Sequence, residues 1–238
     1  MKFVASSLAE NRQGHIDADD NSKHAAADSP VRAGRLPEGR AVGWEFPAER
    51  EAKRRVLLDA VDCVRDDILS GADEAEALTT LPETTVNALY KAGLFALKLP
   101  AALGGAEADP VTQMDVIEAL ARLDASAAWC VMIGATTIAV PAAFLPDAVV
   151  AQIFTEGRVP MAACVIPPTA QGVPVTGGYA VSSRWAFASG IRHAEWVSAA
   201  ARLLRNHAQS PELRWFMLPT SEVQIHDDWQ ALGLKGTG

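Results

Sequence analysis

The stretch from Ser183 to Gly190 carries residues whose types and spacing could do chemistry. Trp185, Phe187 and Ser189 alternate there, so on an extended strand their side chains point to the same face. Two aromatic rings and a hydroxyl on one face suit a flat heteroaromatic ring, with an apolar wall and one donor at its edge. An ordinary sandwich strand with inward-facing aromatics has the same spacing, and spacing alone favours that structural interpretation.

Other groups of chemically active residues give weaker signals. The run Gly233–Gly238 could cradle a phosphate, but it lacks the Lys-Ser/Thr ending of a P-loop, so a tight turn is favoured. Ser189, His193 and Glu195 have the residue types of a Ser-His-acid triad without any nucleophile elbow, which favours a structural histidine near a strand end. The pair Asp227-Asp228 has no metal-ligand spacing, so no metal site is predicted.

Composition narrows the class of protein. The chain has 238 residues, of which 49% are hydrophobic and 21% charged, as in globular proteins. The net charge of -8 argues against a general nucleic-acid binder. Cys63, Cys130 and Cys164 lie far apart and form no CxxC, so we expect neither a disulfide framework nor a zinc knuckle, and a reduced, cytoplasmic protein.

One segment, Ala125–Leu145, has 21 residues without a charge and is long enough to span a bilayer. It consists mostly of Ala, Thr, Gly and Ser, contains Pro141, and has few of the residues that favour insertion. A central helix of a helical domain is therefore favoured, and no membrane partner is expected.

Three stretches of different character must position these residues. Residues 1–46 have no apolar period and predict a disordered tail, ordered only where Trp44 and Phe46 make contacts. Residues 47–157 predict an all-α domain of about five helices. Residues 158–238 predict a small antiparallel β-sandwich or barrel, incomplete at its C-terminal end because the Gly-rich run should lead into another strand.

The helices are predicted from apolar residues that recur every three or four positions. Asp109-Pro110 has the pattern of an N-cap followed by proline in the first turn, and Pro82 and Gly93 bound another helix. One expected inward stripe consists of Leu57, Val61, Val64 and Ile68, and another of Met114, Ile117, Leu120 and Ala121.

The strands are predicted from alternation of apolar and polar residues after Gly157. Gly177-Gly178 suits the two-residue turn of a β-hairpin. The expected strands are Val159–Ile166, Val173–Thr176, Tyr179–Ser183, Trp196–Ala201, Leu213–Leu218 and Glu222–His226, in addition to the stretch around Phe187.

Several of these patterns, in this order, resemble the acyl-CoA dehydrogenase superfamily from about residue 50 to the end. They are Leu81-Pro-Glu, Leu89–Phe95, Gly104-Gly105, Glu118–Ser126, Ser183–Gly190 and Gly233–Thr237. In that superfamily a C-terminal helical bundle follows and supplies the catalytic acid or base. No such bundle occurs in this sequence, so the resemblance implies a fragment, and no catalytic residue is named.

Two details separate the branches of the superfamily. Dehydrogenases carry a Thr-Glu-Pro-Gly-x-Gly-Ser-Asp loop, where this chain has Cys164–Gly172 with Ile166 in place of the threonine. Trp185 replaces the lysine usual in dehydrogenases, and Trp-x-Phe-x-Ser-Gly is similar to the two-component, group D flavin monooxygenases.

The resemblance implies reduced FMN or FAD as cofactor, with Phe187 against the isoalloxazine, Ser189 donating to its N5/O4 edge and Trp185 closing the wall. Val165 and Ile166 fall on the flavin-contacting strand. Implied partners are a small substrate, aromatic ones included, a separate flavin reductase, and further copies of the full-length chain in a homo-oligomer. Two alternatives stay open, an acyl-CoA dehydrogenase using FAD and a non-catalytic remnant or interaction module.

Overall fold

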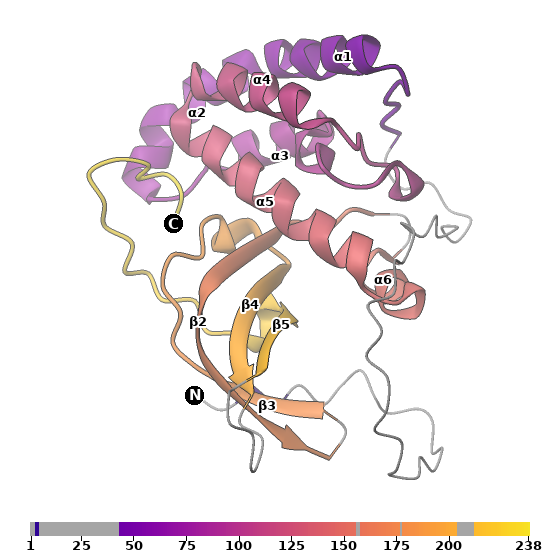
Figure 1. The fold of residues 1–238 in the computed structure, drawn as a ribbon. Coiled ribbons are helices and arrows are strands. Elements are labelled where there is room, and N and C mark those ends of the chain that lie inside the picture. The colour runs from indigo at the N-terminus through magenta and orange to yellow at the C-terminus, as the bar shows by residue number, and fades with distance from the viewer. Residues whose placement is uncertain (1–2, 5–42, 156–157, 177, 204–211) are drawn as a thin grey trace.

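The computed structural model describes residues 3–4, 43–155, 158–176, 178–203 and 212–238. Helices form the upper layer in Figure 1, a curled sheet forms the lower one, and helix α5 runs between them. Most of the predicted tail, 1–46, lies outside the described residues. Where it is described, Trp44 Nε1 donates to the Lys91 carbonyl over 2.9 Å and Phe46 packs on the helical core, which are the contacts expected of these two residues.

The helical layer follows the apolar pattern of the sequence closely. Its elements are α1 (Arg50–Cys63), α2 (Arg65–Leu78), α3 (Glu83–Lys91), the 3₁₀ turns η1 (Leu94–Ala96) and η2 (Ala101–Leu103), α4 (Pro110–Ala121), α5 (Ala125–Phe144) and α6 (Asp147–Ile153). The stripe from Leu57 to Ile68 is buried as predicted, although a break at Val64 divides it between α1 and α2.

Helix α4 confirms the predicted start and part of the predicted face. The Asp109 carboxylate accepts hydrogen bonds from the backbone N–H groups of Val111 and Thr112, at 3.1 and 3.2 Å. The buried row is Thr112, Val116 and Leu120, spaced by four residues, so Leu120 is buried as predicted and Ile117 packs half-buried against the core. Met114 is 65% exposed and Ala121 is exposed, so their assignment to the core was wrong. The helix packs on α1 and α5 through the four-residue row, which turns Met114 outward.

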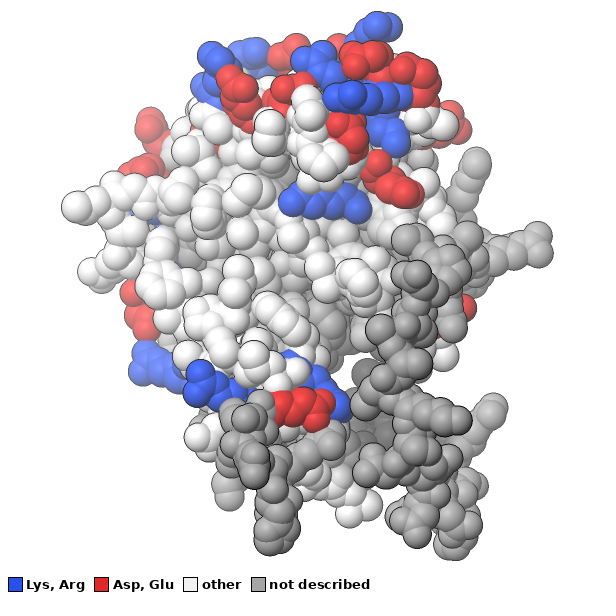
Figure 2. Space-filling model, in the orientation of Figure 1, with Lys and Arg blue, Asp and Glu red and all other residues white. Residues whose placement is uncertain are grey.

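Helix α5 is the central element of the molecule. Asp124 caps it by accepting from Ala127 N over 2.6 Å, and the helix packs against α4, η1 and the first long strand. By length and composition it is the one helix among the described residues that could cross a membrane, and half of its most apolar window is buried in the fold. Figure 2 shows charged side chains gathered over the upper helices, whereas the surface over α5 is nearly free of them.

The sheet confirms the expected order of an all-α part followed by a β part, but its pairing is mixed. Its strands are β1 (Phe3–Val4), β2 (Ala162–Val175), β3 (Gly178–Ser182), β4 (Trp196–Leu203) and β5 (Glu212–Pro219), in the spatial order β1-β3-β2-β4-β5. The predicted hairpin forms between β2 and β3, but Gly178 is paired with Val175 and so belongs to the strand rather than to the turn, and Gly177 lies outside the described residues. Strand β4 lies parallel to β2, because the connection after β3 returns the chain to the start of β2.

The strand predictions differ from the structure in two places, each for an identifiable reason. The expected strands Val159–Ile166 and Val173–Thr176 belong to one strand, β2, whose register shifts between Val165 and Ala170. Pro167-Pro168 lies in that irregularity, where a ladder tolerates residues without an N–H. The expected strand Glu222–His226 is a 3₁₀ turn, Thr220–Glu222, followed by chain without strand pairing.

Candidate functional site

The predicted chemical residues lie in the connection between β3 and β4, which we call the site loop (Ser183–Glu195). Its first part has no strand pairing, so the expectation of one strand face was wrong. Phe187 has φ 63°, in the left-handed region that an aromatic residue rarely adopts. The predicted alternation of side-chain directions along Trp185, Phe187 and Ser189 is therefore interrupted at Phe187. Trp185 packs on the small sheet cluster of Ala170, Val181 and Ala201, whereas the Phe187 side chain is 74% exposed.

A cavity of about 360 Å³ lies between the site loop, α5 and β2. Phe187 and Ser189 line it from the loop, and Ile166, which is 65% exposed, lines it from β2. Trp129 of α5 donates its indole N–H to Ser189 Oγ over 3.1 Å. Because the Ser189 oxygen accepts this bond, its own O–H stays available to donate. This cavity therefore combines exposed apolar side chains with one oriented hydroxyl donor.

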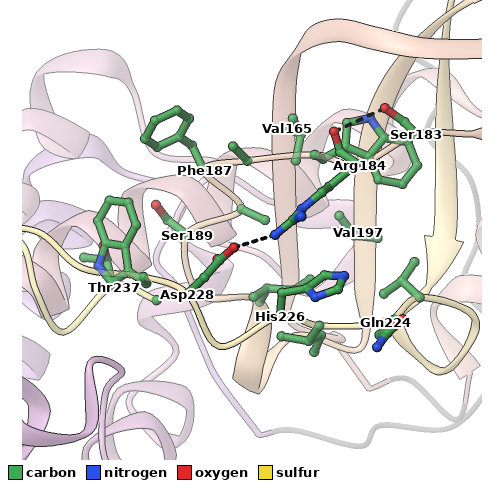
Figure 3. Close-up of a pocket in the computed structure, with 18 of the residues that line it drawn as sticks. Val165, Ser183, Arg184, Phe187, Ser189, Val197, Gln224, His226, Asp228 and Thr237 are labelled. Carbon is green, nitrogen blue, oxygen red and sulfur yellow. Dashed lines mark hydrogen bonds and ion pairs between the residues drawn. The ribbon is translucent and has the colours of Figure 1, made fainter. Parts of the chain in front are cut away.

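A second cavity, of about 780 Å³, lies on the other side of the site loop and is drawn in Figure 3. Val165 and Val197 form its wall on the sheet, and the chain from 223 to 230 forms the opposite side. The Arg184 guanidinium pairs with the Asp228 carboxylate across it, Nη2 to Oδ2, at 2.8 Å. This cavity is more polar in character than the small one.

The structure thus divides the five predicted cofactor contacts between two cavities. Ile166 lines the small cavity, Val165 and Trp185 line the large one, and Phe187 and Ser189 line both. Val165 and Ile166 separate because neighbouring strand residues point to opposite faces. Phe187 and Ser189 stay together at the point where the two cavities meet.

Two indole groups beside the cavities bear on whether an aromatic cofactor fits. Trp185 Nε1 and Trp229 Nε1 are buried and have no hydrogen-bond partner among the described residues. Trp185 lines the large cavity, and Trp229 lines both. A buried N–H without a partner costs free energy, so each is a donor that a bound acceptor would satisfy. Together with the Ser189 hydroxyl, these donors fit a flat ring system with nitrogen and oxygen acceptors at its edge.

Sequence reasoning missed the aromatic residues that complete the site. Trp129 lies in α5, the uncharged helix for which the sequence predicts only a structural role. The one feature of the sequence that could indicate a function for Trp129 is that it is a large aromatic residue among small ones. Trp229 carries no motif of its own. The Gly233–Gly238 run forms the predicted tight turn, with Thr237 N donating to Leu234 O over 3.2 Å. It then bonds to the helical layer, because Gly238 N donates to Thr79 O over 2.8 Å.

The structure does not assemble a Ser-His-acid triad. Glu195 accepts hydrogen bonds from Arg158 and from Met161 N, and Ser189 is engaged by Trp129. His193 lies in a 3₁₀ turn before β4, with its ring 6.3 Å from that of Phe95, and burial lowers its pKa to about 4. Among the described residues, no group of three His, Cys, Asp or Glu side chains could hold a metal.

Comparison with known families shows which class of protein the helical layer resembles. The family description "Acyl-CoA dehydrogenase, N-terminal domain" matches residues 50–145, and the same fold continues into the sheet in solved relatives. Residues 50–145 therefore match the N-terminal domain of the acyl-CoA dehydrogenases, the superfamily that the ordered motifs of the sequence resemble.

Its relatives include oxygenase subunits of flavin-dependent monooxygenases. The chain is 30% identical over 183 residues to the flavin-dependent monooxygenase oxygenase subunit HsaA of Mycobacterium tuberculosis, covering 76% of this chain and 46% of that protein. It is 29% identical over 195 residues to the indole-3-acetate monooxygenase of Pseudomonas putida, covering 81% and 48%. The structure of XiaF from Streptomyces, in complex with FADH2 and glycerol, has a TM-score of 0.73 at 25% identity, covering 80% and 48%. The chain therefore spans about half the length of the curated relatives it matches.

Proposed function

We propose that this chain carries flavin-binding elements of the oxygenase component of a two-component flavin monooxygenase. Reduced FAD or FMN from a separate reductase would react with O2 and a small organic substrate, aromatic ones included. The resemblance of the relatives named above supports this assignment, as do the donors and apolar walls beside Ser189. A cytoplasmic location and assembly into a homo-oligomer are part of the same proposal.

The observation that carries the proposal is the hydrogen bond from Trp129 to Ser189 at the junction of the two cavities. It fixes the serine oxygen as an acceptor toward the helix and leaves its proton for the cavity. Exposed Phe187 and Ile166 offer flat and branched apolar surface on the same small cavity. A hydroxyl donor beside apolar walls suits the polar edge of an otherwise flat ring.

The residues divide the work in a simple way. A bound flavin would supply the oxygen chemistry. Ser189 would hold its hydroxyl proton at the N5/O4 edge, and the apolar side chains of Phe187 and Ile166 would keep water from the ring. Trp185 and Trp229 would gain an acceptor for each buried indole N–H. Residues of this chain would thus bind and orient the cofactor and exclude water from it, and no acid or base is assigned among them.

Anaerobic titration with reduced FAD and reduced FMN, followed by tryptophan fluorescence, tests the proposal. We expect micromolar binding of at least one flavin. Ser189→Ala should weaken it roughly tenfold, because one hydrogen bond contributes about 1 to 1.5 kcal/mol. Ser70→Ala, an exposed serine on α2, is the matched control and should leave the affinity unchanged. Failure of both flavins to bind would contradict the proposal.

A second anaerobic experiment separates the alternatives. Addition of acyl-CoA to the protein loaded with oxidised FAD would bleach the flavin if the chain acted as a dehydrogenase. We expect no bleaching. In a parallel aerobic assay, the complex with reduced flavin should convert a substrate of the right class into a product that carries one oxygen atom from O2. Flavin binding with neither reaction would favour a non-catalytic protein.

A further inference from the structure

The conformation of the site loop needs an external cause. Phe187 sits in the left-handed region, and residues on either side of it form no strand ladder. A non-glycine residue in that region costs of order 1 kcal/mol or more and persists only where its surroundings fix it. Several of the contacts that surround it come from one segment, Asp227–Thr237, which we call the brace.

Ion pairs join the brace to both flanks of the site loop. Arg184, three residues before Phe187, pairs with Asp228 at 2.8 Å, as Figure 3 shows. Arg192, three residues after Ser189, pairs with Asp227. The two carboxylates are neighbours in the sequence, so a single dipeptide holds both ends of the stretch that carries the proposed cofactor contacts.

Two further contacts lie between the ion pairs. The rings of Phe187 and Trp229 meet edge to face, with centroids 6.0 Å apart and planes at 85°. Gly190 N donates to the carbonyl of Thr237 over 2.9 Å. Thr237 is itself buried and forms an isolated β-bridge with Thr80 of the helical layer. The brace is therefore fixed at its far end to a part of the fold that does not include the site loop.

We infer that Asp227 and Asp228 are positioning residues, which hold Phe187 and Ser189 in place through their ion pairs with the two arginines. The effect on flavin rests on the proposed function, whereas the bracing of the loop does not. Asp227, Asp228 and Arg184 are well exposed, with side-chain exposures of 75%, 67% and 72%. Exposed ion pairs are modest in strength and are screened by salt, so the bracing is expected to depend on ionic strength.

Limited digestion with trypsin tests the brace without any flavin, because the protease cleaves after Arg184 and Arg192. Each exposed pair contributes a factor of about 1.4 to 5, so the double variant Asp227→Asn/Asp228→Asn should be cleaved there roughly 2- to 25-fold faster in low salt. In 1 M salt, where the Debye length is about 3 Å, the difference from wild type should disappear. Equal cleavage rates in low salt would overturn the inference.

Two further variants guard against a trivial result. Glu118→Gln removes an exposed ion pair with Arg122 on α4, remote from the loop, and should not change cleavage after Arg184 or Arg192. The exchange Arg184→Asp/Asp228→Arg reverses one pair and should restore slow cleavage after residue 192 relative to Asp228→Asn alone. Fast cleavage in the exchanged variant would show that general loosening, not loss of pairing, explains the result.

The link to the cofactor is tested with reduced FAD and the same proteins. The double variant should bind roughly 2- to 25-fold more weakly in low salt and equally in 1 M salt, a pattern that a purely structural defect would not produce. Faster cleavage with unchanged affinity would overturn the positioning role. If the wild type binds no flavin at all, the proposed function fails, and the cleavage experiment still decides on the brace.

Discussion

The helical layer and the site loop obey different rules. In the helical layer, the stripe from Leu57 to Ile68 is buried as its spacing requires, and Asp109 caps α4. In the site loop, alternation of Trp185, Phe187 and Ser189 predicts a strand that does not form. A periodic sequence pattern reflects the burial of one face of an element against a core. The site loop has no such face, because its conformation depends on separate contacts with the brace. Three predictions test this contrast.

The largest effect is expected in the helical layer. Leu57→Ala removes a fully buried side chain from the core and should lower the free energy of unfolding by about 2 to 5 kcal/mol. Leu69→Ala, at a half-exposed leucine of α2, should cost no more than about 0.5 kcal/mol. Urea unfolding followed by circular dichroism measures both. Similar losses for the two variants would mean that the stripe is not the core of this layer.

A pH-dependent effect is expected where the site loop meets the helical layer. Burial lowers the pKa of His193 to about 4, so the folded state favours the neutral ring. Its contribution is complete above pH 6.5 and is lost as the pH falls toward 4, by roughly 3 kcal/mol in all. His193→Leu should remove this part of the pH dependence of unfolding. His226→Leu, at an exposed histidine, should retain it, and equal curves for wild type and His193→Leu would refute the assignment.

The smallest effect on stability is expected at Phe187. Phe187→Asn and Phe187→Ala both lose the ring contact with Trp229, but asparagine tolerates the left-handed region at φ 63°, so the free energy of unfolding of Phe187→Asn should exceed that of Phe187→Ala by about 0.5 to 1 kcal/mol. Affinity for reduced flavin should fall in both, because the apolar wall is lost. Phe144→Asn, at another exposed phenylalanine, should leave that affinity unchanged. A free energy of unfolding no higher for Phe187→Asn than for Phe187→Ala would argue against strain at this position.

Local signals explain what the sequence could predict. The cap at Asp109, the buried stripe around Val61 and the hairpin of β2 and β3 depend on residues a few positions apart. The resemblance of ordered motifs to a known superfamily placed Phe187 and Ser189 at a site, and the structure brings these two together on both cavities.

The remainder depends on contacts between distant residues, which leave no periodic trace. The parallel pairing of β2 with β4 follows from the path of the connection, and the hydrogen bond from Trp129 to Ser189 joins α5 to the site loop. The left-handed conformation of Phe187 is likewise set by its surroundings rather than by its own preference.

The bridge between Thr80 and Thr237 has a consequence for how the chain folds. Thr80 lies between α2 and α3, and Thr237 lies beyond the last strand, so forming the bridge closes a very long loop and costs chain entropy. Helices form from near neighbours, and contacts of this separation form late. The order of assembly is therefore expected to run from the helical layer to the sheet and finally to the cavities, which would also be the first features lost in partial unfolding.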